Sequence, residues 1–588
     1  MRKLILSAFN HTRFSALDAE KPRLINDRLL LPPGLLKTLS CEAFKRIAFY
    51  MRESHLGLLV AALNDSESSA NEKLVLGTML KNAEIAARGE LALCQDTGTA
   101  SVYGWKDNSA VTAFDDEEEL SAGAAAAYKE NRLRASMVAS TSFFDEYNTG
   151  DNLPVQSHIF ACPDSAGSPD NAGGPDSANR PDDAGNPDDA GGPDSANGPA
   201  YRFLFVAKGG GSSNKTAYFA MTKALLEEKA FRAFLEEKIS LLGTAACPPY
   251  RLALVVGGQS PEFNLEVLKL ATSEILDYAP DFVPGESKDE ARSKGWIRRD
   301  RYWEDQIMEI GRKTGLGAQF GGKHLLLDVR VLRLPRHAAS CPVSIGVSCS
   351  AHRNMLGYID ASGTYLEDLV EEPGPWLQQH GVRYIGSAAD NNMSNSLKDG
   401  KSGSPAFINL NRPMREIRAD LSGLKTGDRI LLSGKLIVAR DAAHLNWHTL
   451  ISEGKELPPY IFEHPIYYAG PAATPPGKII GSIGPTTAQR MDPYAGELMS
   501  RGASLVTLSK GNRSPAWTAA CKKYGGFYLG AIGGAAALPA EENILSQKII
   551  DYPELGMEAV RLIEVRDFPV FMVVDDKGNE LYEQLGAG

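Results

Sequence analysis

Two long stretches in the first half of the chain repeat apolar residues at every third or fourth position, which predicts amphipathic helices. The first stretch covers residues 34–92 and is clearest over Leu56–Leu63 and Leu74–Ala87. The second covers residues 217–243, is rich in Ala, Leu, Glu and Lys, and ends toward Gly243. We therefore expect the first part of the chain to be rich in helix.

Short apolar runs predict the strands, because buried strands read as brief hydrophobic segments between turn residues. In the first part these runs are Leu252–Val256 and Leu325–Leu332. The residues from 429 to 440 are strongly typical of a β-strand. Short strands then alternate with helical segments, at Val506–Leu508, Gly526–Leu529 and Val570–Val574.

Between these regions, prolines recur every six residues from Pro163 to Pro199. Each repeat unit carries Asp, Ala and Gly or Asn but no large apolar residue, so it cannot bury enough surface to offset the entropy of ordering. We predict that residues 163–200 form a disordered acidic insertion. Its flanks, Gln156–Ala161 and Tyr201–Ala207, have the pattern of two strands, which we expect the insertion to join at the tip of a hairpin.

A second polar stretch, rich in Gly, Ser and Asn, spans residues 386–405 and is the best candidate for a linker between domains. The pattern thus predicts an α+β N-terminal domain rich in helices over residues 1–370 and a linker over residues 371–405. A smaller α/β domain is expected over residues 406–588. Two domains also suit a chain of 588 residues, which exceeds what one hydrophobic core usually organises.

Composition narrows the possible partners. The chain is 43% hydrophobic and 23% charged, has a net charge of −11, and contains no long block of Lys or Arg, which argues against nucleic acid or an anionic membrane as the main partner. No apolar run approaches the length of a membrane span. We expect a cytoplasmic protein. The first seventeen residues are basic without an acidic residue and faintly resemble a transit peptide, so a mitochondrial location is the alternative.

Three of the seven cysteines lie beside Gly, Pro or small polar residues, where the backbone can bend to direct a thiolate. They are Cys94, Cys247 and Cys349. The odd count and the absence of a Cys-x-x-Cys pair make a disulfide framework or a zinc ribbon a poor interpretation, and buried inert thiols are the ordinary alternative. Three converging thiolates would suit an iron–sulfur cluster with one open iron, which could act as a Lewis acid.

Three glycine-rich segments could approach a ligand closely. Residues 208–216 resemble a phosphate-binding loop, but Asn214 stands where the last glycine should be, which leaves a nucleotide site as a minor alternative. Residues 315–322 form a second, weaker pattern. Residues 481–490 place two hydroxyls and an arginine on a turn that leads into a helix, which suits a carboxylate.

Several residues would be ordinary if taken singly: Asp96 could cap a helix, His337 could be a surface or core histidine, and Arg134, Arg440 and Arg490 could be solvated charges. Chemistry on a small dicarboxylate would require cations for two carboxylates, a metal that holds an oxygen, and a base for a carbon-bound proton. The sequence contains residues of all these types, but their spacing along the chain does not show whether they lie together in the fold.

Longer motifs resemble those of one family, the class I, iron–sulfur-dependent fumarate hydratases, in their single-chain form. The resemblance runs in order from about residue 40 to the C-terminus. It is carried by Cys94-Gln-Asp-Thr-Gly-Thr, Lys208-Gly-Gly-Gly-Ser-Ser-Asn-Lys, Ala246-Cys-Pro-Pro-Tyr, Gly315-Leu-Gly-Ala-Gln-Phe-Gly-Gly-Lys, Leu334-Pro-Arg-His, Val347-Ser-Cys-Ser-Ala-His-Arg-Asn, Asn409-Leu-Asn-Arg-Pro-Met, His464-Pro-Ile-Tyr-Tyr-Ala-Gly-Pro, Gly484-Pro-Thr-Thr-Ala-Gln-Arg-Met-Asp, Lys510-Gly-Asn-Arg and Tyr552-Pro-Glu-Leu-Gly-Met-Glu.

The resemblance implies one [4Fe–4S] cluster per chain, held by Cys94, Cys247 and Cys349, with Cys341 as a rival ligand. Its open iron would bind the hydroxyl and one carboxylate of the substrate. The resemblance implies three catalytic residues. Thr486 would be the base at C3 of malate, Asp96 would assist the deprotonation of Thr486, and His337 is the third. For substrate binding it implies Gln95, Arg134, Lys208, Gly210, Arg440, Arg490 and Lys510.

The expected reaction is the reversible hydration of fumarate to (S)-malate, in a cleft between the two domains of a homodimer. The alternatives are the same chemistry on tartrate or mesaconate, and an iron–sulfur sensor without turnover. Two departures from the family pattern lie near the motifs: Gln489 stands where glycine is common, and His352 where aspartate is common. We expect these two residues to affect substrate preference.

Overall fold

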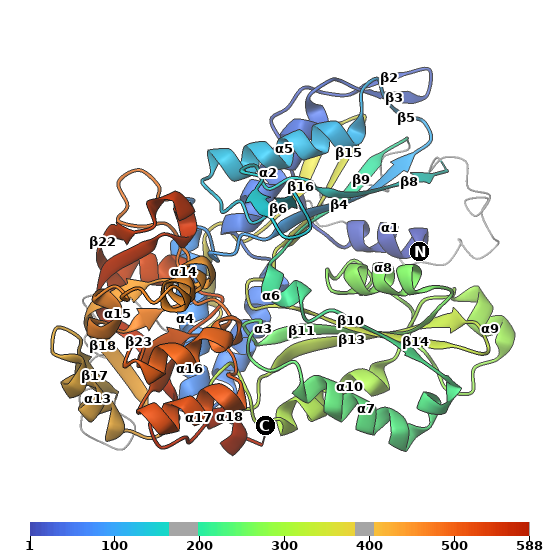
Figure 1. The fold of residues 1–588 in the computed structure, drawn as a ribbon. Helices are drawn as coiled ribbons and strands as arrows, with labels where there is room; N and C mark the ends of the chain where they lie inside the picture. The colour runs from blue at the N-terminus through green and yellow to red at the C-terminus, as the bar shows by residue number, and fades with distance from the viewer. Residues whose placement is uncertain (164–197, 383–404, 587–588) are drawn as a thin grey trace.

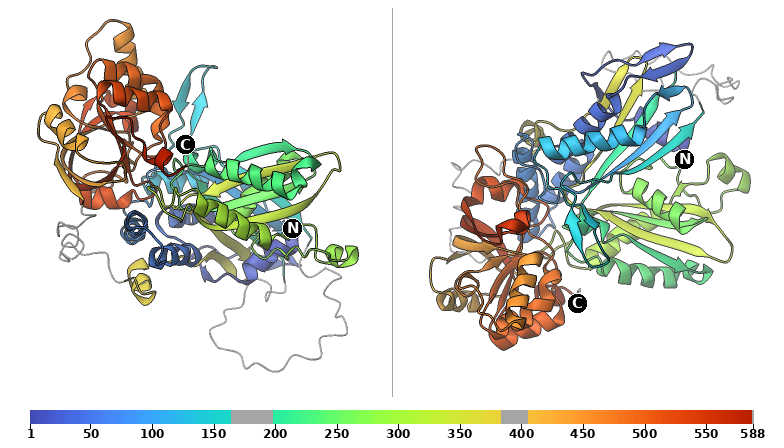
Figure 2. Two further views of the ribbon diagram at one scale, coloured as in Figure 1. Left: turned by 90° about the horizontal axis from the view of Figure 1, so that it is seen from below. Right: turned by 45° about the horizontal axis from the view of Figure 1, so that its top comes forward.

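The computed structural model describes residues 1–163, 198–382 and 405–586, and these residues form a mixed α/β protein built around three large sheets (Figure 1). Most of the proposed insertion, and the linker from residue 383 to 404, lie outside the described residues. Two of the sheets belong to the first part of the chain. The third contains only strands after residue 405, which gather on one side of the molecule (Figure 2).

The first sheet has six strands. Their order is β1 (Phe14–Ala16), β16 (Gly363–Glu367), β15 (Asn354–Asp360), β9 (Tyr201–Lys208), β4 (Thr99–Asp107) and β8 (Gln156–Cys162). The two strands flanking the insertion are therefore present as predicted, but the predicted hairpin is wrong, because β4 lies between them. It pairs in parallel with β8 and antiparallel with β9. An alternating pattern identifies a strand but not its neighbour.

The second sheet has five strands. Their order is β10 (Ala217–Met221), β14 (Cys341–Ser348), β11 (Tyr250–Gly258), β13 (Leu326–Arg336) and β12 (Arg298–Arg299). The two strands predicted here, β11 and β13, are confirmed and pair in parallel. The helix predicted over residues 217–243 is confirmed only over residues 228–240, because residues 217–221 form β10 and residues 223–226 form a separate short 3-10 helix. The strand β10 completes the sheet edge by pairing antiparallel with β14.

Helices cover both of these sheets. The helices α2 (Leu35–Phe49) and α5 (Asp116–Glu130) pack together on the six-stranded sheet, and α7 (Glu228–Ser240) lies beside α10 (Arg301–Lys313) on the five-stranded sheet (Figure 1). Between the sheets lie α1 (Arg2–Asn10) and α8 (Pro261–Ala271), whose apolar residues share one core cluster with both sheets. The N-terminal part thus contains more strand than its sequence pattern predicts.

The third sheet has seven strands. Their order is β17 (Ala406–Asn409), β18 (Arg429–Val438), β19 (Ile466–Tyr467), β20 (Val506–Ser509), β21 (Phe527–Ala531), β23 (Val560–Val574) and β22 (Ile544–Asp551). The strands from β17 to β21 are parallel, and β23 pairs antiparallel with both β21 and β18, so the sheet curves back on itself. The alternation of strand and helix predicted for this region is confirmed, with helices α13 (Met414–Ser422), α14 (Asp441–Ser452), α16 (Asp492–Ser500) and α17 (Pro515–Tyr524).

Shorter elements complete the described structure. They are β2 (Arg23–Ile25), β3 (Arg28–Leu31), β5 (Ala110–Thr112), β6 (Val138–Ser140), β7 (Glu146–Asn148), α6 (Gly210–Ser213), η3 (Lys223–Leu226), α9 (Lys288–Ser293), α11 (Pro373–Gln379), α15 (Tyr460–Glu463), η4 (Ala488–Met491), η5 (Pro539–Asn543), η6 (Pro553–Glu558) and α18 (Leu581–Gln584). Among the helices of the described ranges, none has the length and apolar character needed to cross a membrane.

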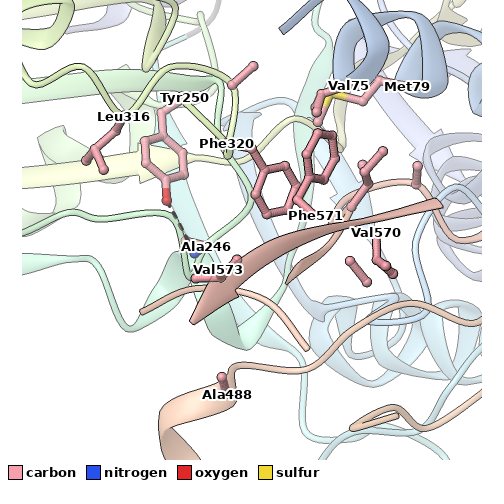
Figure 3. Packing of buried hydrophobic residues seen from close by; sticks show 14 of the residues in the cluster. Val75, Met79, Ala246, Tyr250, Leu316, Phe320, Ala488, Val570, Phe571 and Val573 are labelled. Atoms are coloured by element: carbon pink, nitrogen blue, oxygen red, sulfur yellow. Dashed lines mark hydrogen bonds between the residues drawn. The ribbon is translucent and has the colours of Figure 1, made fainter. Parts of the chain in front are cut away.

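One apolar core joins the early helices to the last sheet. The helices predicted over residues 34–92 include α3 (Glu53–Asn64) and α4 (Ala70–Ala86), and α4 begins with a capping box between Ser69 and Glu72. Residues of both helices share a cluster with β11, β13, β18 and β23. In Figure 3, Phe320 stacks on Phe571 of β23, with ring centroids 4.1 Å apart, beside Val75 and Met79 of α4. This core fixes the relative positions of the loops that connect these helices and strands.

Candidate active site

The fold brings three of the seven thiols together. Cys94 lies between α4 and β4, Cys247 lies between α7 and β11, and Cys349 follows β14 directly. All three side chains are buried, and with Ala351 they form a small cluster of their own. Cys341, the rival ligand, lies at the other end of β14 in the main apolar core. An eight-residue strand spans roughly 25 Å, which is the separation expected between Cys341 and Cys349.

The backbone around Cys247 is shaped to present its thiol. Cys247 adopts a left-handed conformation with φ of 62°, which is uncommon for a residue with a side chain. Its carbonyl oxygen accepts a hydrogen bond from the Ser350 amide (3.1 Å), which ties two of the thiol loops together. Opposite, a Cβ atom at Gly533 would lie 2.5 Å from the Cys247 sulfur, so this position has room only for glycine.

The thiols lie among cations. Burial raises the pKa of Cys94, and burial raises the pKa of Cys247 to about 12, so both are protonated at neutral pH when no metal is bound. Lys510 Nζ lies 2.8 Å from the Cys247 sulfur, and the charges of Arg353 and Lys510 act on Cys94 in the opposite direction to burial. Positive charge here would offset the negative charge of thiolates bound to a metal group.

The donor set fits an iron–sulfur cluster better than a single ion. Soft thiolates select iron–sulfur clusters, and a cubane binds each thiolate through a different iron, so its ligands stand apart. Within residues 1–163, 198–382 and 405–586, no three His, Cys, Asp or Glu side chains converge as ligands of one metal ion would. The three buried thiols with cations around them therefore fit the expected cofactor.

Asp96 is held firmly beside the thiols. Its carboxylate accepts a hydrogen bond from the Gly210 amide (2.9 Å) and forms an ion pair with Arg134 (3.2 Å). Burial alone would raise the pKa of Asp96, but the charges of Arg134, Arg353 and Lys510 hold it below its ordinary value. Asp96 is thus ionised, and the backbone at Gly209 approaches it closely, because a Cβ atom at residue 209 would lie 3.0 Å from its carboxylate oxygen.

Gln95 connects the Cys94 loop to the C-terminal part of the chain. Its side-chain amide donates to the Pro485 carbonyl (3.3 Å), while a Cβ atom at Gly484 would lie 2.4 Å from its oxygen. Nearby, Ser482 donates to the Ala92 carbonyl (2.7 Å). The glycine-rich segment 481–490 and the Cys94 loop are therefore in direct contact.

A hydroxyl group and a cluster of arginines lie beside the contact between segment 481–490 and the Cys94 loop. Arg490 donates from Nη1 to the Thr486 hydroxyl (3.2 Å) and is fixed by an ion pair with Asp441 (2.8 Å). Arg440 is buried, and after burial itself the charges of Arg134 and Arg490 act to lower its pKa. Its Nε atom has no hydrogen-bonding partner among the described residues. Its Nη2 atom forms an ion pair with Glu558 (2.7 Å), which leaves Nε as the guanidinium nitrogen that suits a further anion.

His337 lies apart from this group, whereas Lys208 lies near its edge, where the charge of Cys349 affects the Lys208 pKa. His337 is exposed in the turn between β13 and β14, so within one chain the length of β14 separates it from Cys349. Lys208, at the end of β9, lines a cavity of about 370 Å³ next to α8. Burial, together with the charge of Lys269, lowers its pKa to about 8. Among the described residues, no hydrogen bond or ion pair joins Lys208 Nζ to another side chain.

The remaining predicted residues lie close to one another through the contacts above: Cys94, Gln95, Asp96, Arg134, Gly210, Cys247, Cys349, Arg440, Thr486, Arg490 and Lys510. Sequence reasoning missed Arg353, which is buried and whose pKa is affected by Cys94, Cys349 and Asp96, although it lies in the Val347–Asn354 motif. It also missed Gln319 in the second glycine-rich segment. The Gln319 side chain hydrogen-bonds the Pro248 carbonyl (2.9 Å) and both backbone groups of Gly533.

Comparison with known proteins gives a consistent result. A family model described as fumarate hydratase (Fumerase) matches residues 37–168 and 192–357, and one described as fumarase C-terminus matches residues 379–585. The chain is 44% identical to "Fumarate hydratase class I, anaerobic" of Escherichia coli, over 95% of this chain and 91% of that protein. It is 44% identical to "Fumarate hydratase 2" of Leishmania major (95% and 88%) and 42% identical to "Fumarate hydratase 1, mitochondrial" of the same organism (95% and 92%).

Proposed function

The chain belongs to the class I fumarate hydratase family and is a hydro-lyase that hydrates fumarate, and we propose that the thiols, arginines and Thr486 described above form its active site. The observation that carries this proposal is the juxtaposition of three buried thiols with an arginine cluster and a hydroxyl. The contacts run from Cys247 through Lys510 to the loop that contains Thr486. The product is (S)-malate in this proposal.

Cys94, Cys247 and Cys349 would hold one [4Fe–4S] cluster per chain. When bound, this cluster would supply a Lewis acid at the iron that no cysteine ligates. Because burial raises the pKa of Cys94 and Cys247, loading the protein must release protons from these thiols. Lys510 and Arg353 would then compensate the negative charge of the bound thiolates.

The arginines would bind and orient the two carboxylates of the substrate. Arg440 offers an unpartnered Nε atom, and an anion beside it would relieve the repulsion that Arg134 and Arg490 exert on it. Gln95 lies at the junction with the thiol loops and would position the carboxylate nearest to Cys94. Lys208 and Gly210 remain predicted binding residues, although the Gly210 amide is engaged with Asp96 in this structure.

Thr486 would accept the proton from C3 of malate in the dehydration direction. A threonine hydroxyl is a weak base unless a neighbour stabilises its deprotonated form. Arg490 is such a neighbour, because its guanidinium donates to the hydroxyl oxygen. Asp96 is not hydrogen-bonded to Thr486 among the described residues, so we assign it to holding Arg134 in place and propose that it assists Thr486 only through bound substrate or water.

The site would lie in a cleft between an N-terminal domain (residues 1–370) and a C-terminal domain (residues 406–588), since Gln95 and Ser482 join the two parts at this point. The predicted role of His337 would require a second subunit, because its own chain keeps it away from the thiols. We propose a homodimer for this reason. A cytoplasmic location is proposed, with the mitochondrion as the alternative.

The reaction is tested with anaerobically reconstituted protein by following the loss of the ultraviolet absorbance of fumarate. We expect rapid consumption of fumarate and formation of (S)-malate. Iron–sulfur-loaded protein that leaves fumarate unchanged would contradict the proposal. Mesaconate and tartrate, assayed in parallel, show which diacids the arginine cluster accepts.

A further inference from the structure

Two buried histidines hold the residues on either side of Cys349. His55, on α3, donates from Nε2 to the Ser350 carbonyl oxygen (2.8 Å). His352 accepts at Nδ1 from the Ser348 hydroxyl (2.7 Å). Both imidazoles are almost completely buried, and their ring centroids are 5.3 Å apart. The turn that presents the Cys349 thiol is therefore attached to the protein interior through its two neighbours.

The contacts of each imidazole restrict its orientation. His55 must donate from Nε2, since its partner is a carbonyl, and its Nδ1 atom has no partner among the described residues. Burial lowers the pKa of His352 to about 4, so that imidazole is neutral. Its Nε2 atom lies 3.0 Å from the Glu274 carboxylate and 2.8 Å from the side-chain amide nitrogen of Asn354, and its Nδ1 atom lies within hydrogen-bonding distance of the Ser348 hydroxyl.

Glu274 anchors His352 to a buried network of charges. Its carboxylate also pairs with Arg251 (2.5 Å) and Arg52 (3.3 Å), and it accepts a hydrogen bond from the Ser54 hydroxyl (2.9 Å). These charges hold the pKa of Glu274 well below its ordinary value, against the effect of burial. Such a carboxylate has little freedom to move, so the imidazole bound to it is fixed in direction.

The same turn is joined to a second thiol loop. The Ser350 amide donates to the Cys247 carbonyl (3.1 Å), so a displacement of Ser350 would move the Cys247 backbone as well. Residues that orient metal ligands through hydrogen bonds control how well the metal is retained. The loss of such a residue typically costs about 10- to 100-fold in metal affinity or activity. We propose that His55 and His352, the latter fixed by Glu274, are positioning residues that hold Cys349 in the geometry required to retain the iron–sulfur cluster.

This proposal rests on the proposed cofactor, and iron retention can be measured without turnover. The protein is reconstituted anaerobically, and iron release to a chelator is followed by the loss of visible iron–sulfur absorbance. We expect His55→Ala and His352→Ala to release iron at least about 10-fold faster than the unaltered protein. His55→Gln places an amide near the position of Nε2 and should restore retention toward that of the unaltered protein.

The matched control is Leu56→Ala, which removes from the same helix a buried side chain that belongs to a different apolar cluster from Cys349. It should lower Tm and leave the rate of iron release unchanged. Iron release from His55→Ala and His352→Ala at the unaltered rate, or a rate equal to that of Leu56→Ala at matched Tm, would overturn the positioning role. Unaltered protein that takes up no iron and sulfide would overturn the cofactor assignment as well.

Discussion

The ammonium group of Lys510 lies 2.8 Å from the sulfur of Cys247 and donates a hydrogen bond to it. Burial nevertheless raises the pKa of this thiol from 9.0 to about 12, because desolvation outweighs the neighbouring positive charge. The metal-free protein therefore binds the Cys247 proton more tightly than the unfolded chain does. The stability that this difference contributes is fully present below pH 9 and is lost as the pH rises toward 12.

This relationship predicts a pH-dependent difference between two metal-free proteins. The free energy of unfolding by urea is measured under reducing conditions from pH 8 to pH 10.5 for the unaltered protein and for Cys247→Ala. The stability advantage of the unaltered protein over the variant should decrease above pH 9. A difference that stays constant across this range would show that the thiol titrates normally.

Thr486→Ala should abolish most of the turnover and leave iron content unchanged. The hydroxyl is the proposed base, and loss of such a group typically costs about 10²- to 10⁴-fold in rate. The measurement is kcat for fumarate hydration on protein with a confirmed iron and sulfide content. Thr486→Ser keeps the hydroxyl and should retain far more activity than the alanine variant. Equal activity of the alanine variant and the unaltered enzyme would assign the base elsewhere.

Arg440→Met should raise KM for fumarate by about 10- to 100-fold, the equivalent of losing a charge-assisted hydrogen bond worth roughly 1.5–3 kcal/mol. The matched control is Arg566→Met, because Arg566 is an exposed arginine of the last sheet. Steady-state kinetics of both variants test the assignment. An unchanged KM in Arg440→Met would remove Arg440 from the carboxylate site.

Phe571→Ala should destabilise the fold by about 3–5 kcal/mol, because the ring is fully buried and stacked on Phe320 at the junction of the early helices and the last sheet. Thermal unfolding of the metal-free protein measures the effect. Phe407→Ala, which removes a ring that is 55% exposed, is the control and should change Tm little. Equal losses in the two variants would show that the Phe320–Phe571 contact does not join these parts of the chain.

Periodicity predicted many elements correctly where the hydrophobic pattern was strong, as in α3, α4, β11 and β18. It failed to predict the structure where pairing with a neighbouring strand determines the fold. Nothing in the apolar pattern of β8 and β9 reveals that β4 separates them. Residues 217–221 continue a helical pattern but complete a sheet edge, since pairing with β14 outweighs local propensity.

The site was predictable only through motifs. Local context identified the three cysteines, but their convergence depends on loops from distant parts of the chain. Resemblance supplied Arg440, Thr486 and Lys510. Neither approach found Arg353 or His55, and His352 was noted only as a departure from the family pattern, because a buried positioning group has no signature beyond its residue type. Contacts such as that of Arg490 with Thr486 become visible only in three dimensions.

The central claim is that Cys94, Cys247 and Cys349 hold the cofactor on which hydration depends. The most direct test measures iron and sulfide content together with fumarate hydration after anaerobic reconstitution of Cys349→Ala and Cys341→Ala. Both thiols are buried, but only Cys349 lies with the other two. We predict that Cys349→Ala loses iron–sulfur absorbance and activity together, while Cys341→Ala retains both. Loss of the cofactor from Cys341→Ala with its retention in Cys349→Ala would contradict the account.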